Sequence, residues 1–257
     1  MQPFPEEPQD LHPWPRRPKR LATAVVEELT DRIVGGELPS GSVLPIEPVL
    51  CEMFGVSRTV VREAVKSLEA MRLVRAQQGQ GTTVRHFEEW DLLNPVVLAA
   101  SVRHDAEMAI LDDLIDTRCA LESQMAAQAA ERATDAEVEA ISAHMARLYD
   151  EVDDPARYLR ADLAFHDAIM RASGNRLARA VIHTINAEAF RSFRYLGETT
   201  PADCRESNVA HQAIHDRIVA RDTGGADTAM TDHIRGSWHR RRPKDGARPP
   251  KRAAADS

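Results

Sequence analysis

Residues 54–64 read FGVSRTVVREA, in which a glycine turn and a serine stand directly before a run with helical periodicity. Serine is favoured at a helix N-cap, so Ser57 predicts a helix that continues to about Met71. One face of this helix is apolar, with Val61, Ala64, Val65 and Leu68. The residues predicted on the opposite face are Ser57 at the cap, Arg58, Thr59, Arg62 and Lys66.

The neighbouring sequence predicts the rest of a small domain. Apolar residues at helical spacing predict a helix over 21–34, and a second helix fits 45–54, where a proline is tolerated in the first turn. After the third helix, two short stretches at 73–76 and 82–85 flank QQGQG, a hairpin signal with glycines at its tip. Three helices followed by a two-stranded wing predict a winged helix-turn-helix over residues 21–86.

An arginine and a threonine in the first turn of a recognition helix suit readout of base edges in the major groove, because the Arg fork matches guanine O6 and N7. A solvated helix face would explain Arg58 and Lys66 equally well. The turn before the helix and the glycine wing after it favour DNA binding.

The rest of the chain has the pattern of a helical bundle. A linker is expected over 87–104, followed by a helical domain over 105–240. The capping box Thr134-Asp135-Ala136-Glu137 opens one of its helices. Further helices are expected over 106–133, 155–172, 175–197, 202–221 and 225–240, separated in part by Gly174-Asn175 and Gly224-Gly225. The fold class is therefore mainly α, a winged helix-turn-helix plus an all-α antiparallel bundle.

Composition agrees with this division. Of 257 residues, 43% are apolar and only 5% aromatic, which favours packed helices over a β-sandwich. Residues 16–86 carry a net charge of +3 and residues 87–236 carry −12, as expected for a nucleic-acid reader joined to a separate regulatory domain. The Pro-rich segment 1–20 and the basic segment 241–257 are predicted to be disordered tails. No apolar run is long enough to span a membrane, so a cytoplasmic protein without a membrane partner is expected.

Four residues of the second domain form a candidate metal site. Asp162 and His166 are four residues apart and share one helix face, and two more imidazoles on later helices, His211 and His233, would complete a set of three nitrogens and one oxygen. Such a set suits a divalent ion, zinc or nickel. By spacing alone, these residues fit equally well as surface or hydrogen-bonded core groups, since the chain has ten histidines.

The motifs LPIE at 44–47, FGVSRTVVREA at 54–64 and GQGT at 79–82 resemble the winged-helix signature of the GntR family of bacterial transcription regulators. The resemblance implies a homodimer that binds operator DNA through Arg58 and Arg62, with the wing tip at Gln78 and Gly79 in the minor groove. One departure is Pro48, where many members carry a polar or basic residue that contacts DNA.

Five further motifs resemble the helical effector domain of the FadR subfamily in its metal-binding version; they are RCALE at 118–122, DLAFH at 162–166, SGN at 173–175, AH at 210–211 and DHI at 232–234. The resemblance implies Asp162, His166, His211 and His233 as metal ligands, and Arg118 and Asn175 as contacts of a small carboxylate effector. A salt bridge to Glu122, four residues along the same helix, is the alternative role of Arg118.

The segment WDLLNPVVL at 90–98 is similar to the linker of regulators of sugar-acid catabolism, which points to an aldonate or related acid; packing of the two domains is the alternative role. The leading hypothesis is a repressor, not an enzyme, released by a small organic acid bound near the metal. A metal-dependent hydrolase using the Asp/His set is the alternative, although no ligand has a glutamate base beside it in a known zinc motif. A third interpretation is an oligomerising protein with a vestigial winged helix.

Overall fold

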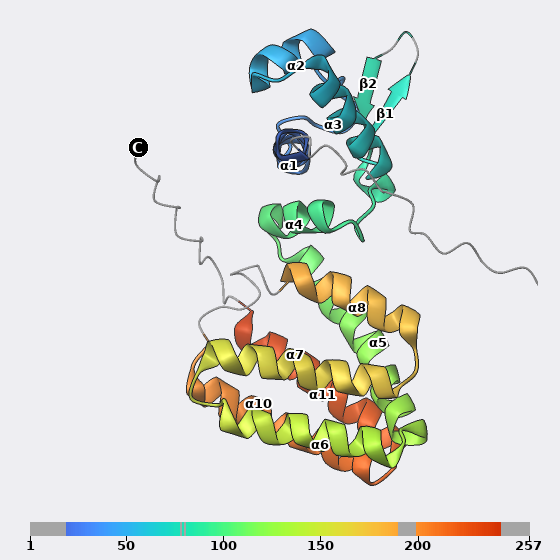
Figure 1. Cartoon of the computed structure of the whole chain (residues 1–257), viewed down its shortest axis with the longest axis vertical. Helices are drawn as coiled ribbons and strands as arrows, with labels where there is room; N and C mark the ends of the chain where they lie inside the picture. Colours follow the sequence, from blue (N-terminus) through green and yellow to red (C-terminus); the bar gives the residue numbers. More distant parts are fainter. Residues whose placement is uncertain (1–18, 78, 80, 190–198, 243–257) are drawn as a thin grey trace, which may run out of the picture. The chain divides into compact units, whose positions relative to one another are not determined.

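The computed structural model describes residues 19–77, 79, 81–189 and 199–242. The chain divides into two compact units, Met1–Asp91 and Leu92–Ser257 (Figure 1).

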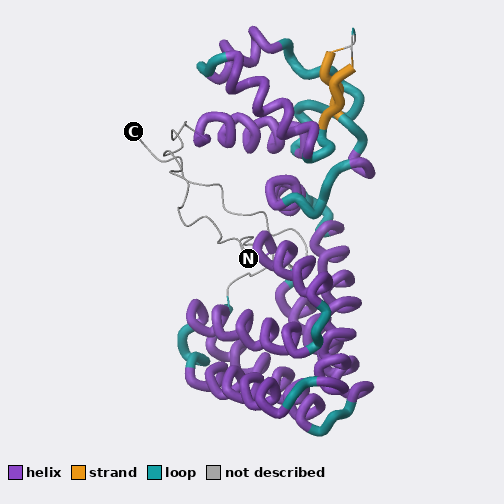
Figure 2. Tube along the Cα trace, turned by 45° about the vertical axis from the view of Figure 1, so that its right-hand side comes forward, coloured by secondary structure: helices purple, strands orange, loops and turns teal. Residues whose placement is uncertain are grey.

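The first unit is a three-helix domain with a hairpin. Its elements are α1 (Lys19–Val34), α2 (Glu47–Phe54), α3 (Arg58–Ala70), β1 (Val74–Gln77), β2 (Gly81–Val84) and the short 3-10 helix η1 (Phe87–Glu89). The core lies where α1 and α2 pack on α3, and its largest fully buried side chains are Leu29, Leu50, Leu68 and Leu73. This arrangement is a winged helix-turn-helix, with the two strands drawn in orange in Figure 2.

The hairpin is antiparallel, and its register pairs Val74 with Val84 and Gln77 with Gly81. The segment before α2 adds to its edge, since Leu44 N donates to Thr82 O and Val84 N donates to Ser42 O. Gly81 has a φ of +84°, and a Cβ there would stand 3.0 Å from a methyl carbon of Val43. A side chain at this position would therefore strain the backbone and crowd the edge pairing.

The second unit is all helical. Its elements are α4 (Pro95–His104), α5 (Ala109–Arg132), α6 (Asp135–Asp150), α7 (Pro155–Ala172), α8 (Arg176–Ala189), α10 (Pro201–Val219) and α11 (Thr223–Arg241). Helix α5 packs mainly on α11, α10 packs on α11 and α6, and α7 packs on α6 and α5. Helices α6, α7 and α10 lie side by side in Figure 1, and α8 packs on both α5 and α4. The structure confirms the mainly α class.

Local signals in the sequence account for most helix starts. Ser57 Oγ accepts from Val60 N to cap α3, and the box at the start of α6 is complete, since the Thr134 and Glu137 side chains each bond the other residue's backbone N–H. A second capping box, Thr200 with Asp203, starts α10.

Two segments differ from the sequence expectations. Residues 95–104 of the expected linker form α4, a helix whose Val97, Ala100 and Val102 are buried in the second unit. The pair Gly224-Gly225 does not separate helices, because α11 begins at Thr223. Asp222 caps α11 by accepting from Gly225 N, and a Cβ on Gly225 would collide with that carboxylate.

The expected helix at 175–197 is described as α8 up to Ala189, and its remainder lies outside the described residues, as do most of the two expected tails. Within the described part of the chain, no helix combines the length and apolar character that crossing a membrane requires.

Candidate metal centre and DNA-binding helix

Helix α3 presents a polar face to solvent. Val61, Ala64 and Leu68 are fully buried against the rest of the first unit, which directs the intervening residues outward. The exposed residues include four of those predicted to bind DNA, Arg58, Thr59, Arg62 and Lys66. Gly79 is also exposed at the hairpin turn with a φ of +80°, whereas Gln78 lies outside the described residues. This face carries three cations, Arg58, Arg62 and Lys66, which phosphate binding needs, and two of them pair with the carboxylates of Glu47 and Glu63.

The four predicted metal ligands come together in the second unit. Asp162 and His166 lie on α7, His211 on α10 and His233 on α11, and one ligand atom from each lies within 4.8 Å of the others. The three histidines are buried and Asp162 is partly buried. Three separate helices therefore direct imidazole and carboxylate groups to one point inside the bundle.

The contacts within this cluster run through the Nε2 atoms. His233 Nε2 lies 3.2 Å from His166 Nε2 and 3.1 Å from His211 Nε2. His211 Nε2 also lies 3.1 Å from Asp162 Oδ1. Imidazole nitrogens bound to zinc at about 2.0–2.1 Å stand roughly 3 Å apart around the ion, so these spacings match those of a coordinated set.

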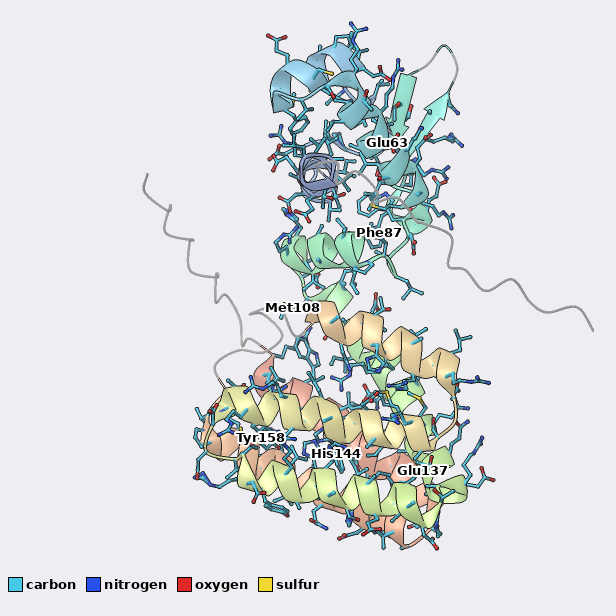
Figure 3. The ribbon with its side chains drawn as sticks, in the orientation of Figure 1. Glu63, Phe87, Met108, Glu137, His144 and Tyr158 are labelled. Atoms are coloured by element: carbon cyan, nitrogen blue, oxygen red, sulfur yellow. The ribbon has the colours of Figure 1, made fainter. Side chains whose placement is uncertain are left out.

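Outer hydrogen bonds orient two of the imidazoles. Glu122 on α5 lies 2.9 Å from His166 Nδ1 through its Oε2. Tyr158 on α7, labelled in Figure 3, donates to Asn208 Oδ1 at 2.7 Å, and its oxygen lies 3.3 Å from His211 Nδ1. A second partner on the far nitrogen is the usual way in which proteins fix the tautomer of a metal-binding histidine.

The electrostatics define the protonation of these outer groups. Burial alone would raise the pKa of Glu122, but the Arg118 guanidinium and His166 outweigh it and hold that pKa at about 2. Burial, with Asp162 nearby, raises the pKa of Tyr158 far above its ordinary value. Glu122 is therefore an ionised acceptor and Tyr158 keeps its proton, so each can accept a hydrogen bond from an Nδ1–H of the imidazole that it faces, and a bound ion would take the Nε2 atom.

The inner groups have the charge that a cation needs. Burial alone would raise the pKa of Asp162, but the hydrogen bond from His211 and the other imidazoles hold it far below its ordinary value. Burial lowers the pKa of His211 and, more strongly, that of His233, so both are neutral at neutral pH. A divalent ion would replace the proton between His211 Nε2 and Asp162, and it would then face one ionised oxygen and the lone pairs of the imidazoles. The residues thus fit a divalent metal ion.

The two predicted effector contacts are already engaged in the protein. Arg118 is buried, and its Nε donates to Glu122 Oε1 at 2.6 Å, which is the salt bridge that the sequence left as an alternative. Asn175 caps α8, since its Oδ1 accepts from Ala178 N at 3.1 Å. Both residues therefore have structural roles that any effector contact would have to accommodate.

Five other histidines of the second unit lie outside the cluster, and two of them have side-chain partners of their own. His215 Nε2 lies 2.8 Å from Ser142 Oγ, and His183 Nε2 lies 2.8 Å from Asp167 Oδ1. Across the described ranges, the Asp162 group is the single set of three or more potential ligands that converges on one point. The sequence did not predict that Glu122 and Tyr158 contact the metal ligands. The distance along the chain between each of them and the histidine that it contacts gives no signal of either role.

Comparison with known proteins agrees with both units. Residues 21–84 match the family described as bacterial regulatory proteins, gntR family, and residues 113–236 match the FCD domain. The NanR transcriptional repressor of Citrobacter rodentium is 30% identical over 242 residues, covering 90% of each chain. This chain belongs to the gntR family.

A second relative of this gntR-family protein is similar over most of its length, and one solved structure shares the fold. The galactonate operon transcriptional repressor of Escherichia coli K12 is 27% identical over 216 residues, covering 84% of this chain and 94% of the relative. Among solved structures, Lar, which controls expression of the Listeria monocytogenes agr system, is similar in fold with a TM-score of 0.55 at 17% identity, covering 88% of this chain and 98% of that one.

The gntR-family protein is therefore a DNA-binding transcription regulator with an FCD domain. Membership of a regulator family also sets the hydrolase alternative aside, since the Asp/His cluster is typical of the metal site of FCD domains.

Proposed function

We propose that this gntR-family regulator is a cytoplasmic homodimeric repressor that leaves its operator when a small organic acid binds beside a divalent ion held by Asp162, His166, His211 and His233. The observation that carries the proposal is the convergence of these four residues, each pair of ligand atoms within 4.8 Å, inside the domain joined to the winged helix. Zinc or nickel is the ion that three imidazoles and one carboxylate suit best.

The effector is proposed to be a carboxylate, in particular a sugar acid or related hydroxy acid. A bound divalent ion would supply open coordination positions for a carboxylate oxygen, because four protein ligands do not complete an octahedral shell. Arg118 is proposed as the second anchor because its guanidinium is buried beside Glu122, which also contacts the proposed ligand His166. Asn175 is proposed as a secondary contact. The galactonate repressor among its relatives supports the class of acid, and a gel-shift titration with a panel of aldonates and hydroxy acids tests it.

A packed route leads from the metal ligands to the segment that follows the DNA-binding unit. Asp167, next to His166 on α7, holds Arg179 of α8 through two hydrogen bonds of 2.7 and 3.0 Å. Helix α8 packs on α4, which begins three residues after the boundary at Leu92. An acid that shifts α7 would thereby bias α4 and the placement of the two recognition helices, as a coupling between two sites requires.

The homodimer is proposed because winged-helix regulators that read a symmetric operator need two recognition helices. The second unit exposes large apolar side chains that a partner could cover, including Leu177 at 77% exposure and Val209 at 72%. Sedimentation of the full chain should give twice the monomer mass at micromolar concentration. A monomer that binds a palindromic operator with full affinity would contradict the proposal.

Substitutions on α3 test the DNA-binding face. Arg58→Ala should weaken operator binding by about 1–3 kcal/mol and relax sequence preference, because a directional contact to a base edge is lost. Lys66→Ala should weaken binding to all DNA similarly and reduce the salt dependence by about one phosphate contact. Gel shifts at several salt concentrations, on DNA upstream of the regulated genes and on scrambled DNA, measure both. Unchanged affinity and selectivity in Arg58→Ala would reject α3 as the reading helix.

A further inference from the structure

We infer that Glu47 is a positioning residue for DNA recognition, which holds the Arg62 guanidinium by one edge and leaves its two terminal nitrogens as a paired donor for a single base, guanine. The inference rests on the proposed role of α3 as the reading helix. It adds a residue of α2 to the determinants of sequence preference.

The contact that carries this inference joins α2 to α3. Arg62 Nε lies 3.0 Å from both Glu47 Oε1 and Glu47 Oε2, so one N–H is shared between the two carboxylate oxygens. Within the described part of the chain, neither terminal nitrogen of Arg62 makes a hydrogen bond, and the side chain is 63% exposed. The guanidinium is thus fixed at its inner edge while its outer edge remains accessible.

Glu47 itself stands on a rigid part of the fold. It is the first residue of α2, between Pro45 and Pro48, whose rings restrict the backbone on either side. Leu44 is 4% exposed and Leu50 is 1% exposed, which anchors the helix start on the core. A carboxylate at a helix N-terminus is also favoured by the helix dipole. Pro48 therefore replaces a common DNA contact with a residue that stiffens the support of Arg62.

The other cations of α3 lack such a support. Arg58 has no hydrogen bond or ion pair in the described ranges, and Lys66 has one long contact of 3.5 Å to Glu63 on its own helix. A free arginine side chain loses rotamer freedom when it binds a base, whereas a buttressed one has lost much of it in advance. The two terminal N–H groups of a held guanidinium match guanine O6 and N7.

A purely electrostatic role for Glu47 predicts the opposite effect on DNA binding from a positioning role, so an experiment can distinguish the two. A carboxylate beside a DNA-binding face repels phosphates, so removing its charge should tighten binding to every duplex if it has no positioning role. If Glu47 positions Arg62, removing it should instead weaken binding to the preferred duplex relative to other DNA.

The test uses the full chain and a pool of duplexes with a randomised core, from which the unaltered protein selects its preferred sequence. Affinity is then measured for that duplex and for poly(dI·dC). Glu47→Ala should lower the ratio of the two affinities about tenfold, without loss of poly(dI·dC) binding. Glu47→Gln, whose amide oxygen still accepts from Nε, should fall between the two proteins. The control is Glu52→Ala, which removes the same charge from an exposed position on α2 and should keep the ratio.

A double variant separates the inference from the assignment of α3. In an Arg62→Ala background, Glu47→Ala should leave the affinity ratio unchanged. When the selection is repeated with each single variant, both variants should lose their preference at the same G·C pair. If Arg62→Ala lowers the ratio but Glu47→Ala does not, or if the two effects add, Glu47 has no positioning role. If Arg62→Ala itself has no effect, the proposed role of α3 fails first.

Discussion

Replacing Glu122 by alanine is expected to lower the free energy of unfolding by about 3–5 kcal/mol, because the change breaks a buried ion pair by removing the carboxylate that faces the Arg118 guanidinium. Arg118 Nε lies 2.6 Å from Glu122 Oε1, and the two side chains are 7% and 0% exposed. His166 Nδ1 also loses its acceptor, which adds to the cost. Urea unfolding of the full chain, followed by circular dichroism, measures the change.

The matched control for Glu122 is Glu131→Ala on the same helix. The Glu131 side chain is 66% exposed and meets Arg132 at 3.4 Å, so its loss should change the free energy by less than about 0.5 kcal/mol. Equal destabilisation by the two substitutions would mean that the buried pair contributes no more than a surface one.

Removal of a bound divalent ion is expected to produce the second large effect. Ligands from α7, α10 and α11 would tie three helices together through the ion, so chelation should lower the melting temperature. At a metal concentration a thousand times the dissociation constant, the stabilisation is about 4 kcal/mol. Scanning calorimetry before and after chelation, with elemental analysis of the purified protein, measures the ion and its contribution.

His211→Ala isolates the role of the site. It should abolish stoichiometric metal binding, and DNA binding without effector should survive, because the winged helix has its own core. His215→Ala is the control, since His215 lies one turn along α10 and contacts Ser142 instead of the cluster. Full metal content in His211→Ala, or a melting temperature that chelation does not change, would remove the ion from the proposed mechanism.

Part of the candidate site was readable in the sequence because it is local. Asp162 and His166 share a helix face by their spacing of four residues, a relation that holds in any α-helix. That His211 and His233 would meet them followed from resemblance to a family, since spacings of 45 and 22 residues along the chain have no geometric meaning before the helices pack. Glu122 was foreseen only as a partner of Arg118, and its second contact with His166 was not foreseen.

Short-range chemistry in the sequence by itself determined the individual elements. Ser57 and the Thr134 to Glu137 box start helices because their caps satisfy backbone N–H groups within three residues, and the glycines at 79 and 81 permit the positive φ of the wing. Only the tertiary structure decided the contacts between elements: α4 as a packed helix where a linker was expected, the pairing of Glu47 with Arg62, and the bond between Glu122 and His166. These depend on which helix faces meet, and burial of apolar surface along the whole length of each helix sets that choice, so no short window of sequence contains it.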